Sequence, residues 1–309
     1  MKPLHIHTPL LLSHPLSQMM GSNVFLKLEA LQPSGSFKDR GVGTLCVHYA
    51  KQNVNGFISS SGGNAGMAVA YASKALGIPA KVIIPKTTPP IMVKMLQAES
   101  VEVIIEGDNW DAADALAREI ATKEGFAYIP PFDHPVIWQG YHSLINELQQ
   151  DEVKPDAIIV SVGGGGLFSG LAQGLATIGW HDIPLVTAET SGAASLANAV
   201  KEKKRIRLDK IDTIAVTLGA KQICQEAFDW TQKRPVFPQV VTDKEAVNAC
   251  LRFADDHRLL VEPACGAALA LLYEKRSILQ QFKNIVVIVC GGNGVNLDLL
   301  KGWQKQFNL

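Results

Sequence analysis

The chain has 309 residues, of which 47% are apolar, and it carries 29 basic and 29 acidic side chains. This length favours one large or two modest domains. A formal net charge of zero gives no field that would attract nucleic acid or an anionic membrane, so we expect neither as a partner. The five cysteines are scattered and form no C-x-x-C pair, so we expect neither a disulfide framework nor a zinc site.

We expect no targeting signal in the first residues. Prolines and histidines interrupt the stretch MKPLHIHTPLLLSHPLSQ, and no apolar core with a small-residue cleavage site follows. No apolar run reaches membrane-spanning length. The basic run from Lys201 to Arg205 is interpreted as a solvated helix end. We therefore expect a cytoplasmic protein in a reducing environment.

Strand-like and helix-like segments alternate along most of the chain. Apolar runs predict strands at 56–61, 80–85, 101–107, 156–162, 183–189 and 284–290. Helical patterns lie at 64–77, 89–100, 108–125, 142–150, 167–179 and 242–257. Asp108 is the predicted N-cap of its helix, Gly77 and Gly125 are predicted stops, and Thr242 with Glu245 predicts a capping box. This alternation predicts an α/β fold with mostly parallel sheets and active-site loops at the carboxyl ends of the strands.

Four loops carry the residues on which a functional interpretation depends. The first, LQPSGSFKDRGV, places Lys38 at a predicted helix start. The positive potential there lowers the pKa of an amine, which favours the neutral nucleophile that bonds to an aldehyde. Taken alone, an ordinary lysine paired with Asp39 is the favoured interpretation.

The second loop, SSSGGNAGMA, runs from Ser59 to Ala68 and enters a helix with free backbone N–H groups that suit a carboxylate or a phosphate. A glycine turn capped by Asn64 explains it equally well. The third loop, SVGGGGLFSG, lacks both the G-K-[ST] ending of a Walker A motif and the spacing of a dinucleotide fingerprint. Its glycines therefore favour a single phosphate group.

The fourth loop, IVVIVCGGNG, ends a buried strand at Cys290, which on its own is more often a small core residue. An imine-forming lysine, an asparagine amide, a phosphate cradle and a neutral thiol together match the aldehyde, phenolate, phosphate and ring nitrogen of pyridoxal 5'-phosphate. The four loops together therefore predict this cofactor.

With these loops in this order, the chain resembles the serine/threonine dehydratases, and in particular the compact L-serine dehydratases. These belong to the pyridoxal-phosphate enzymes of the tryptophan-synthase-β fold (fold type II). The likeness covers nearly the whole chain and rests on the segments QPSGSFKDRG, GNAGMAVAYA, YIPPFDHPVIWQG, SVGGGGL, AETSGA and LVEPACGAALA. SFKDRG also occurs in threonine synthases, whereas SVGGGGL together with a cysteine before GG is specific for the dehydratases.

The resemblance implies two open, twisted, mostly parallel α/β domains with the cofactor in the cleft between them. The large domain would comprise residues 1–36 and 137–309, and the small domain residues 37–136, with a crossing near YIPPFDHP. The implied reaction is an α,β-elimination that converts L-serine to pyruvate and ammonia, and L-threonine to 2-oxobutanoate. We expect a homodimer from the family, and no amino-acid-sensing domain after the Cys290 strand.

Residue roles follow from the same resemblance. Lys38 would anchor the cofactor covalently and act as the catalytic base, with Phe37 against the pyridine ring. The cofactor-binding residues would be Phe37, Lys38, Asn64, Gly163, Gly164, Gly165, Gly166, Leu167, Thr217 and Cys290. The substrate carboxylate would bind to Ser61, Gly62, Gly63, Asn64 and Ala65. K⁺ or another monovalent cation would bind to Gly163, Glu189, Ala193, Ser195, Leu218 and Ala220.

The chain departs from the family pattern at three positions. Gly62 stands where racemases and many threonine dehydratases have a serine, which weakens a racemase interpretation and predicts modest turnover that Gly62→Ala would raise. Asp39 stands where dehydratases usually have an aliphatic residue, which keeps threonine synthase or another β/γ-replacement enzyme as an alternative. Thr217 stands where an alanine usually packs over the ring, and its hydroxyl either bonds the cofactor or crowds it. A non-catalytic binding protein for the cofactor or an amino acid is the remaining alternative.

Overall fold

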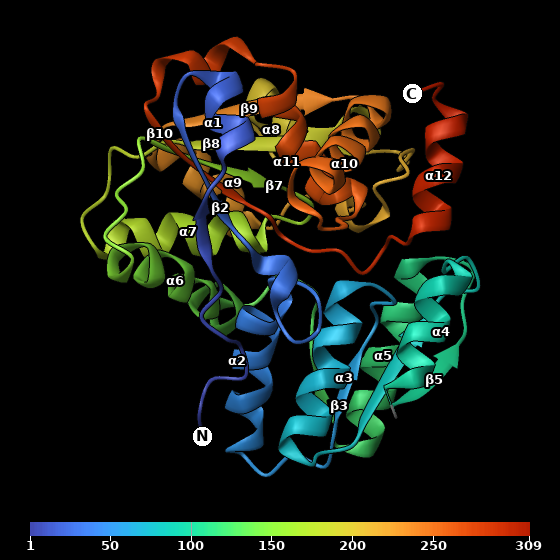
Figure 1. Ribbon diagram of the computed structural model, residues 1–309. Coiled ribbons are helices and arrows are strands. Elements are labelled where there is room, and N and C mark those ends of the chain that lie inside the picture. Colours follow the sequence, from blue (N-terminus) through green and yellow to red (C-terminus); the bar gives the residue numbers. More distant parts are fainter. Residues whose placement is uncertain (100) are drawn as a thin grey trace. The chain divides into compact units, whose positions relative to one another are not determined.

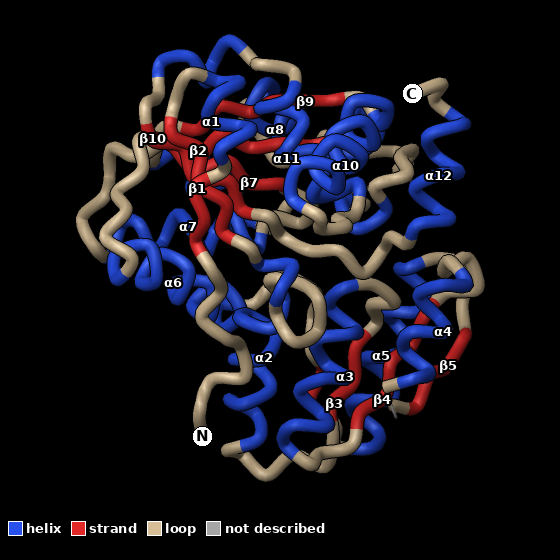
Figure 2. The backbone as a smooth tube through the Cα atoms, viewed as in Figure 1, coloured by secondary structure: helices blue, strands red, loops and turns tan. Residues whose placement is uncertain are grey.

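Two parallel-stranded sheets organise the chain. The computed structural model describes residues 1–99 and 101–309. The chain divides into a smaller unit, residues 1–6 and 32–140, and a larger unit, residues 7–31 and 141–309. Each unit contains one sheet, whose strands are shown in red in Figure 2. The division made from the sequence differs from this one, because residues 1–6, 32–36 and 137–140 belong to the smaller unit.

The smaller unit has a four-stranded, entirely parallel sheet in the order β5-β4-β3-β6. Its strands are β3 (Phe57–Ser59), β4 (Ala80–Ile84), β5 (Glu102–Ile105) and β6 (Ala127–Tyr128). Its helices are α2 (Lys38–Ala50), α3 (Asn64–Leu76), α4 (Pro90–Ala98) and α5 (Trp110–Glu124), labelled in Figure 1. The helix expected at 89–100 includes residue 100, which lies outside the described residues.

The twofold periodicity of β4 sends its side chains to opposite faces of this sheet. Ile83 packs with Ala113, Ala117 and Ala121 of α5. Its neighbours on the strand point the other way and pack with α3 and α4, in a cluster formed by Met67, Val82, Ile84 and Leu96. Because both faces are covered, the strands read as continuous apolar runs.

Helix termini in this unit follow the predicted signals with one exception. Gly77 and Gly125 end α3 and α5 in the left-handed conformation, as predicted. The prediction that Asp108 is the N-cap of α5 is wrong. Asn109 occupies that position, because its side chain accepts a hydrogen bond from the backbone N–H of Ala112 at 3.0 Å.

The larger unit has a six-stranded sheet in the order β1-β2-β10-β7-β8-β9, in which only the β1–β2 pair is antiparallel. Its strands are β1 (Leu10–Leu12), β2 (Asn23–Lys27), β7 (Ala157–Ser161), β8 (Leu185–Thr190), β9 (Val236–Val241) and β10 (Asn284–Ile288). Most neighbouring strands are therefore parallel in both sheets, as the sequence predicts.

The helices of the larger unit are α1 (His14–Met20), α7 (Gly166–Thr177), α8 (Ser195–Glu202), α9 (Gln225–Lys233), α10 (Asp243–His257), α11 (Pro263–Tyr273) and α12 (Leu297–Gln306). Helix α6 (Pro135–Gln150) begins before the boundary between the units and ends after it. Short 3₁₀ turns form η1 (Glu29–Leu31), η2 (Ser191–Ala193), η3 (Val216–Leu218) and η4 (Ser277–Gln281). The capping box of Thr242 and Glu245 is present at the start of α10, as predicted.

The core of the larger unit centres on α11, all of whose residues are buried. This helix packs against β7, β8 and β10, and α10 packs on it in turn. A side chain at Gly266 would come within 2.3 Å of the backbone oxygen of Ala246, so glycine is required for the close approach of α10 and α11.

Two observations bear on the expectations drawn from composition. All five cysteines are free and buried. Among the helices of residues 1–99 and 101–309, none has both the length and the apolar character needed to cross a membrane.

Candidate active site

Lys38 is the first residue of α2, in the smaller unit. The N-cap Phe37 provides no side-chain cap, and the backbone N–H of Lys38 donates a hydrogen bond to Oγ of Ser36 at 3.4 Å. The ammonium nitrogen Nζ of Lys38 donates a hydrogen bond to the backbone oxygen of Pro131 and lies 5.0 Å from the centroid of the Phe37 ring. The predicted anchor is therefore at a helix start and beside the aromatic ring that the sequence paired with it.

Asp39 and Arg40, which follow the lysine, are both buried. The carboxylate of Asp39 accepts a hydrogen bond from the backbone N–H of Ser34 at 2.8 Å. That bond ties the preceding turn to α2, and Gly35 makes the turn possible with a φ of 83°. Asp39 thus has a structural contact that explains an acidic residue at this position without reference to a substrate.

The loop at 61–65 leads from β3 into α3 in the same unit. Asn64 is buried and begins α3, and the N-cap Gly63 provides no side-chain cap. A side chain at Gly66 would lie 2.0 Å from the backbone oxygen of Ser61, so the loop packs directly on the first turn of the helix. This geometry leaves the first N–H groups of α3 without an intrahelical partner, which suits a carboxylate.

Gly62 has a neighbour that the sequence did not reveal. A side chain there would place its Cβ 2.8 Å from the Cγ2 methyl of Thr88 and 3.1 Å from that of Ile84. Thr88 therefore occupies part of the space that a side chain at position 62 would need.

A polar network of buried, partly buried and exposed side chains adjoins this loop. Ser60 directly precedes the loop and donates a hydrogen bond to Asp114 of α5 at 2.6 Å. Tyr128 donates a hydrogen bond to the same carboxylate. Arg118 also donates to it, at 2.8 Å. Burial and the hydrogen bond to Asp114 raise the pKa of Tyr128, so its hydroxyl remains a donor. Sequence reasoning missed this network, because its members are far apart along the chain.

The phosphate loop lies in the larger unit, between β7 and α7. Gly165 is the N-cap of α7, has a φ of 90° and offers no side-chain cap. A Cβ at Gly165 would lie 2.5 Å from the Cβ of Ala227, and one at Gly163 would lie 3.2 Å from the backbone oxygen of Thr217. Glycine is thus required here, and the free N–H groups of the helix start form an anion-binding cradle.

Cys290 follows β10 in the same unit and is buried. A hydrogen bond with Cys265, burial and the negative charge of Glu262 raise its pKa well above the ordinary value. The group is therefore a neutral thiol at neutral pH. Ser161, at the end of β7, donates a hydrogen bond to the backbone oxygen of Ala264 at 2.6 Å, which ties the approach to the phosphate loop to the start of α11.

Thr217 neither points at open space nor has a free hydroxyl. Its Oγ1 donates a hydrogen bond to Oε1 of Glu262 at 2.6 Å. The other carboxylate oxygen of Glu262 accepts from the backbone N–H of Gly294 at 2.9 Å. The hydroxyl proton of Thr217 is therefore committed to Glu262, a residue that the sequence analysis did not single out.

Two of the residues proposed for a monovalent cation, Ser195 and Leu218, lie beside Gly163 of the phosphate loop. Burial raises the pKa of Glu189 to about 7. Hydrogen bonds from α8 act in the opposite direction but have a smaller effect than burial. Its two oxygens accept from the N–H groups of Leu196 and Ala197, each at 2.7 Å. Ser195 donates to the backbone oxygen of Gly163 at 3.5 Å. In the part of the chain that the structure describes, no group of three or more His, Cys, Asp or Glu side chains is placed to hold a metal ion.

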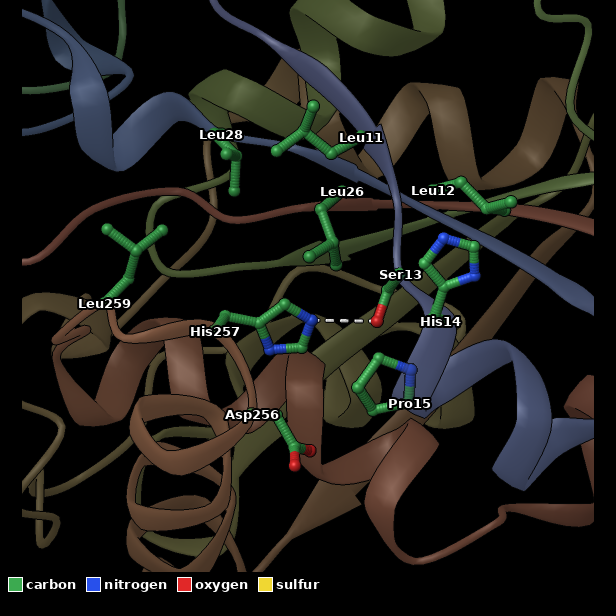
Figure 3. Close-up of a pocket in the computed structure, with 10 residues that line it drawn as sticks. All are labelled: Leu11, Leu12, Ser13, His14, Pro15, Leu26, Leu28, Asp256, His257 and Leu259. Carbon is green, nitrogen blue, oxygen red and sulfur yellow. Dashed lines mark hydrogen bonds between the residues drawn. The ribbon is translucent and has the colours of Figure 1, made fainter.

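A separate cavity of about 230 Å³ lies in the larger unit (Figure 3). Five of its ten lining residues are leucines, and Ser13 and His257 form a hydrogen bond of 2.8 Å at its wall. Burial lowers the pKa of His257, so the imidazole is neutral at neutral pH. None of the residues that the sequence selected lines this cavity.

The residues present fit pyridoxal phosphate by their chemistry. Lys38 provides a primary amine at a helix start, the loop at Gly163–Leu167 provides a cradle that any Cβ at Gly163 or Gly165 would crowd, and Cys290 provides a neutral thiol. The first of these belongs to the smaller unit, and the other two are connected within the larger unit.

Comparison with known proteins identifies the class to which this fold and these loops belong. The family of pyridoxal-phosphate dependent enzymes matches residues 1–291, and the chain belongs to that family. The human protein named L-serine dehydratase/L-threonine deaminase is 43% identical, with 100% of this chain and 97% of that protein covered.

Solved structures agree with this assignment. A fungal L-serine ammonia-lyase from Rhizomucor miehei superposes with a TM-score of 0.94 at 36% identity, covering 99% of this chain and 100% of that one. Maize serine racemase superposes with a TM-score of 0.89 at 29% identity, covering 99% of this chain and 93% of that one. The fold is thus that of the fold type II enzymes, as the sequence predicts, and it is shared by dehydratases and racemases alike.

Proposed function

We propose that this chain is a pyridoxal-phosphate-dependent ammonia-lyase that converts L-serine to pyruvate and ammonia, and L-threonine to 2-oxobutanoate and ammonia. Full-length similarity to the human and fungal enzymes supports the reaction class. The observation that carries the proposal is the buried Cys290, whose raised pKa keeps it a neutral thiol. A neutral partner leaves the cofactor's ring nitrogen without a proton, which favours loss of the β-hydroxyl over transamination.

Lys38 performs the proton chemistry in this proposal. Bound pyridoxal phosphate supplies the electron sink that makes the α-proton of an amino acid acidic. The Lys38 amine first anchors the cofactor and, once displaced by the substrate, removes the α-proton as a general base. The carbonyl of Pro131 accepts a hydrogen bond from Nζ and so orients the amine.

The other predicted residues bind and orient. Phe37 would lie against the ring of the bound cofactor, the Asn64 side chain would bond its phenolic oxygen, and the N–H groups from Gly163 to Leu167 would hold its phosphate. The loop from Ser61 to Ala65 binds the substrate carboxylate at the start of α3. The uncapped helix starts and buried positions described above support these roles.

Racemisation and replacement are less well supported. A racemase needs an acid–base group on each face of the substrate, and Gly62 has no side chain to supply the second. The threonine-synthase alternative depended on Asp39, whose contact with the Ser34 N–H gives it a structural role instead. Elimination is therefore the function that the residues support best.

We also propose a cation, an assembly and a location. K⁺ or another monovalent cation would lie among Glu189, Ser195 and the backbone oxygens near Gly163. The burial of a carboxylate at Glu189 supports this, because a bound cation would offset the cost of its charge. The family likeness supports a cytoplasmic homodimer that acts in amino-acid catabolism.

A substrate panel tests the function. Purified protein loaded with pyridoxal phosphate is incubated with L-serine, L-threonine, D-serine and O-phosphohomoserine, and keto acid and ammonia are measured together. The proposal predicts equal amounts of both products from L-serine and L-threonine. Interconversion of L- and D-serine without keto acid, or threonine formation from O-phosphohomoserine, would contradict it. If none of the substrates reacts and no cofactor is bound to a lysine, the alternative of a non-catalytic binding protein is favoured.

A further inference from the structure

Glu262 is a buried carboxylate for which the proposed reaction has no use. It is 2% exposed and occupies the N-cap position of α11, yet its side chain forms no capping hydrogen bond to that helix. Its carboxylate instead accepts from Thr217 of η3 at 2.6 Å and from the backbone N–H of Gly294 at 2.9 Å. The carboxylate of Glu262 therefore connects two loops, η3 and the segment after Cys290. The residues that it joins, 217 and 294, are 77 positions apart in the sequence.

Both loops adjoin predicted cofactor contacts. The backbone oxygen of Thr217 lies 3.2 Å from where a Cβ of Gly163 would be, so η3 packs against the phosphate loop. A Cβ at Gly294 would come within 2.9 Å of Oε2 of Glu262, so the segment after Cys290 lies directly on the carboxylate. Thr217 thus contacts the phosphate loop through its backbone and Glu262 through its side chain.

The carboxylate also acts on the thiol. The hydrogen bond with Cys265, burial and the negative charge of Glu262 are among the causes that raise the pKa of Cys290. A buried carboxylate that lost one of its donors would pay a desolvation cost and move, because charged groups in such places require all of their partners. Its position relative to Cys290 would then change.

We propose that Thr217 is a positioning residue that, with the Gly294 N–H, fixes Glu262 and thereby the Cys290 end of the cofactor site. This inference rests on the proposed function, which places the ring nitrogen of pyridoxal phosphate at Cys290. It also answers the question that the Thr217 hydroxyl raises, since the hydroxyl donates to Glu262 and is not available to donate to the cofactor.

The chain offers a closely matched control for this interaction. Thr213 donates through its Oγ1 to Oδ1 of Asp243 at 2.5 Å, and the other oxygen of Asp243 accepts from the backbone N–H of Ile214 at 3.0 Å. This is the same arrangement of a threonine, a carboxylate and a backbone N–H, without a predicted cofactor contact. Thr213→Val therefore removes the same kind of hydrogen bond four residues before Thr217, together with the one that its Oγ1 accepts from the backbone N–H of Ala215 at 3.0 Å, and is a stringent control for disturbance of η3.

The test measures the affinity of the apo protein for pyridoxal phosphate by titration of tryptophan fluorescence, and for inorganic phosphate by competition. Thr217→Val, which keeps the shape and loses the hydroxyl, is expected to bind pyridoxal phosphate about tenfold more weakly, as loss of one partner of a buried charged group predicts. The affinity for inorganic phosphate should be unchanged, because valine retains the backbone oxygen beside Gly163. Thr217→Ser, which restores the donor, and Thr213→Val should both bind pyridoxal phosphate as the wild type does.

Equal affinity of Thr217→Val and wild type for pyridoxal phosphate would overturn the inference, as would an equal loss in Thr213→Val. A parallel loss of affinity for inorganic phosphate would also overturn it, because Thr217 would then shape the phosphate loop and not the Cys290 end. If Thr217→Val does not fold, Thr217→Ala and Thr217→Ser are compared in its place, with the same expected difference. Failure of the wild type to bind pyridoxal phosphate would refute the proposed function first and this inference with it.

Discussion

Two helices, α3 in the smaller unit and α7 in the larger, begin in the same way and differ in what surrounds that start. Both have a glycine N-cap, Gly63 and Gly165, and neither has a side-chain cap. At α7 the cradle is made from backbone alone, and Gly165 is held at a φ of 90° against Ala227. At α3 polar side chains accompany the backbone, with Asn64 buried in the first turn and Ser61 beside it.

This difference suits the two groups that we assign to the helix starts. A cofactor phosphate would stay bound from one turnover to the next, and rigid backbone N–H groups are sufficient to hold it. A substrate must enter and leave, and side chains next to the backbone add selectivity to its site. The following substitutions test this contrast in order of expected effect.

Lys38→Ala is expected to have the largest effect, because Lys38 is the first residue of α2 and the proposed anchor and base. Removal of a general base reduces turnover by at least about a hundredfold, and loss of the anchor adds to this. Keto-acid formation from L-serine measures the effect, and Lys51→Ala at the exposed end of the same helix is the control. Turnover within tenfold of the wild type would assign the base elsewhere.

Gly165→Ala tests the cradle of α7. A left-handed conformation costs a non-glycine residue about 1–2 kcal/mol, and crowding against Ala227 adds a comparable amount, about 1–3 kcal/mol. We expect a lower thermal midpoint and weaker binding of pyridoxal phosphate. Gly179→Ala is the matched control, since Gly179 has a φ of 76° near the end of α7 but no atom within 4 Å of the added Cβ. It should lose stability through strain alone and keep its cofactor affinity; weakened binding in this control would contradict the assignment.

Gly62→Ala tests the loop before α3 and is expected to change turnover a few-fold. The sequence predicts a rise, but the added Cβ would lie 2.8 Å from the Cγ2 atom of Thr88. The double variant Gly62→Ala/Thr88→Ser removes that methyl group and should have a higher kcat for L-serine than Gly62→Ala alone. Thr88→Ser alone serves as the control, with turnover close to that of the wild type. If Gly62→Ala leaves kcat unchanged or lower in both backgrounds, the position does not limit the rate.

The cation site beside the α7 cradle is expected to give the smallest effect. K⁺ should raise the thermal midpoint by a few degrees over tetramethylammonium at equal ionic strength, because a ligand that binds only the folded state stabilises it. Glu189→Gln should abolish the difference, whereas Glu202→Gln at the exposed end of α8 should retain it. Equal midpoints of the wild type in both salts would contradict the proposal.

The sequence predicts most of the fold because its signals are local. The strands around Ile58, Ile83 and Ile104 and the helix stops at Gly77 and Gly125 depend on periodicity and backbone preference within a few residues. The helix start at Asn109 shows the limit of these signals, since Asp108 and Asn109 are both good N-caps and only the geometry distinguishes them. Strand β9 was missed because it contains Pro238 and is only partly buried.

The residues of the candidate site are likewise of two kinds, those that local sequence signals indicate and those that only the fold brings together. Glycine loops and Lys38 are recognisable from motifs, because their chemistry is contained in consecutive residues. The contacts of Ser60 with Asp114 and of Thr217 with Glu262 join residues 54 and 45 positions apart. No local pattern indicates such pairs, since only the packing of the strands and helices brings them together.

Chemical trapping of the cofactor tests the central claim most directly. Protein loaded with pyridoxal phosphate is reduced with borohydride, which makes the bond between the lysine and the cofactor permanent, and the labelled peptide is identified by mass spectrometry. Our account predicts a single label on Lys38, the first residue of α2. A label on another lysine, or none in a protein that binds the cofactor, would contradict it.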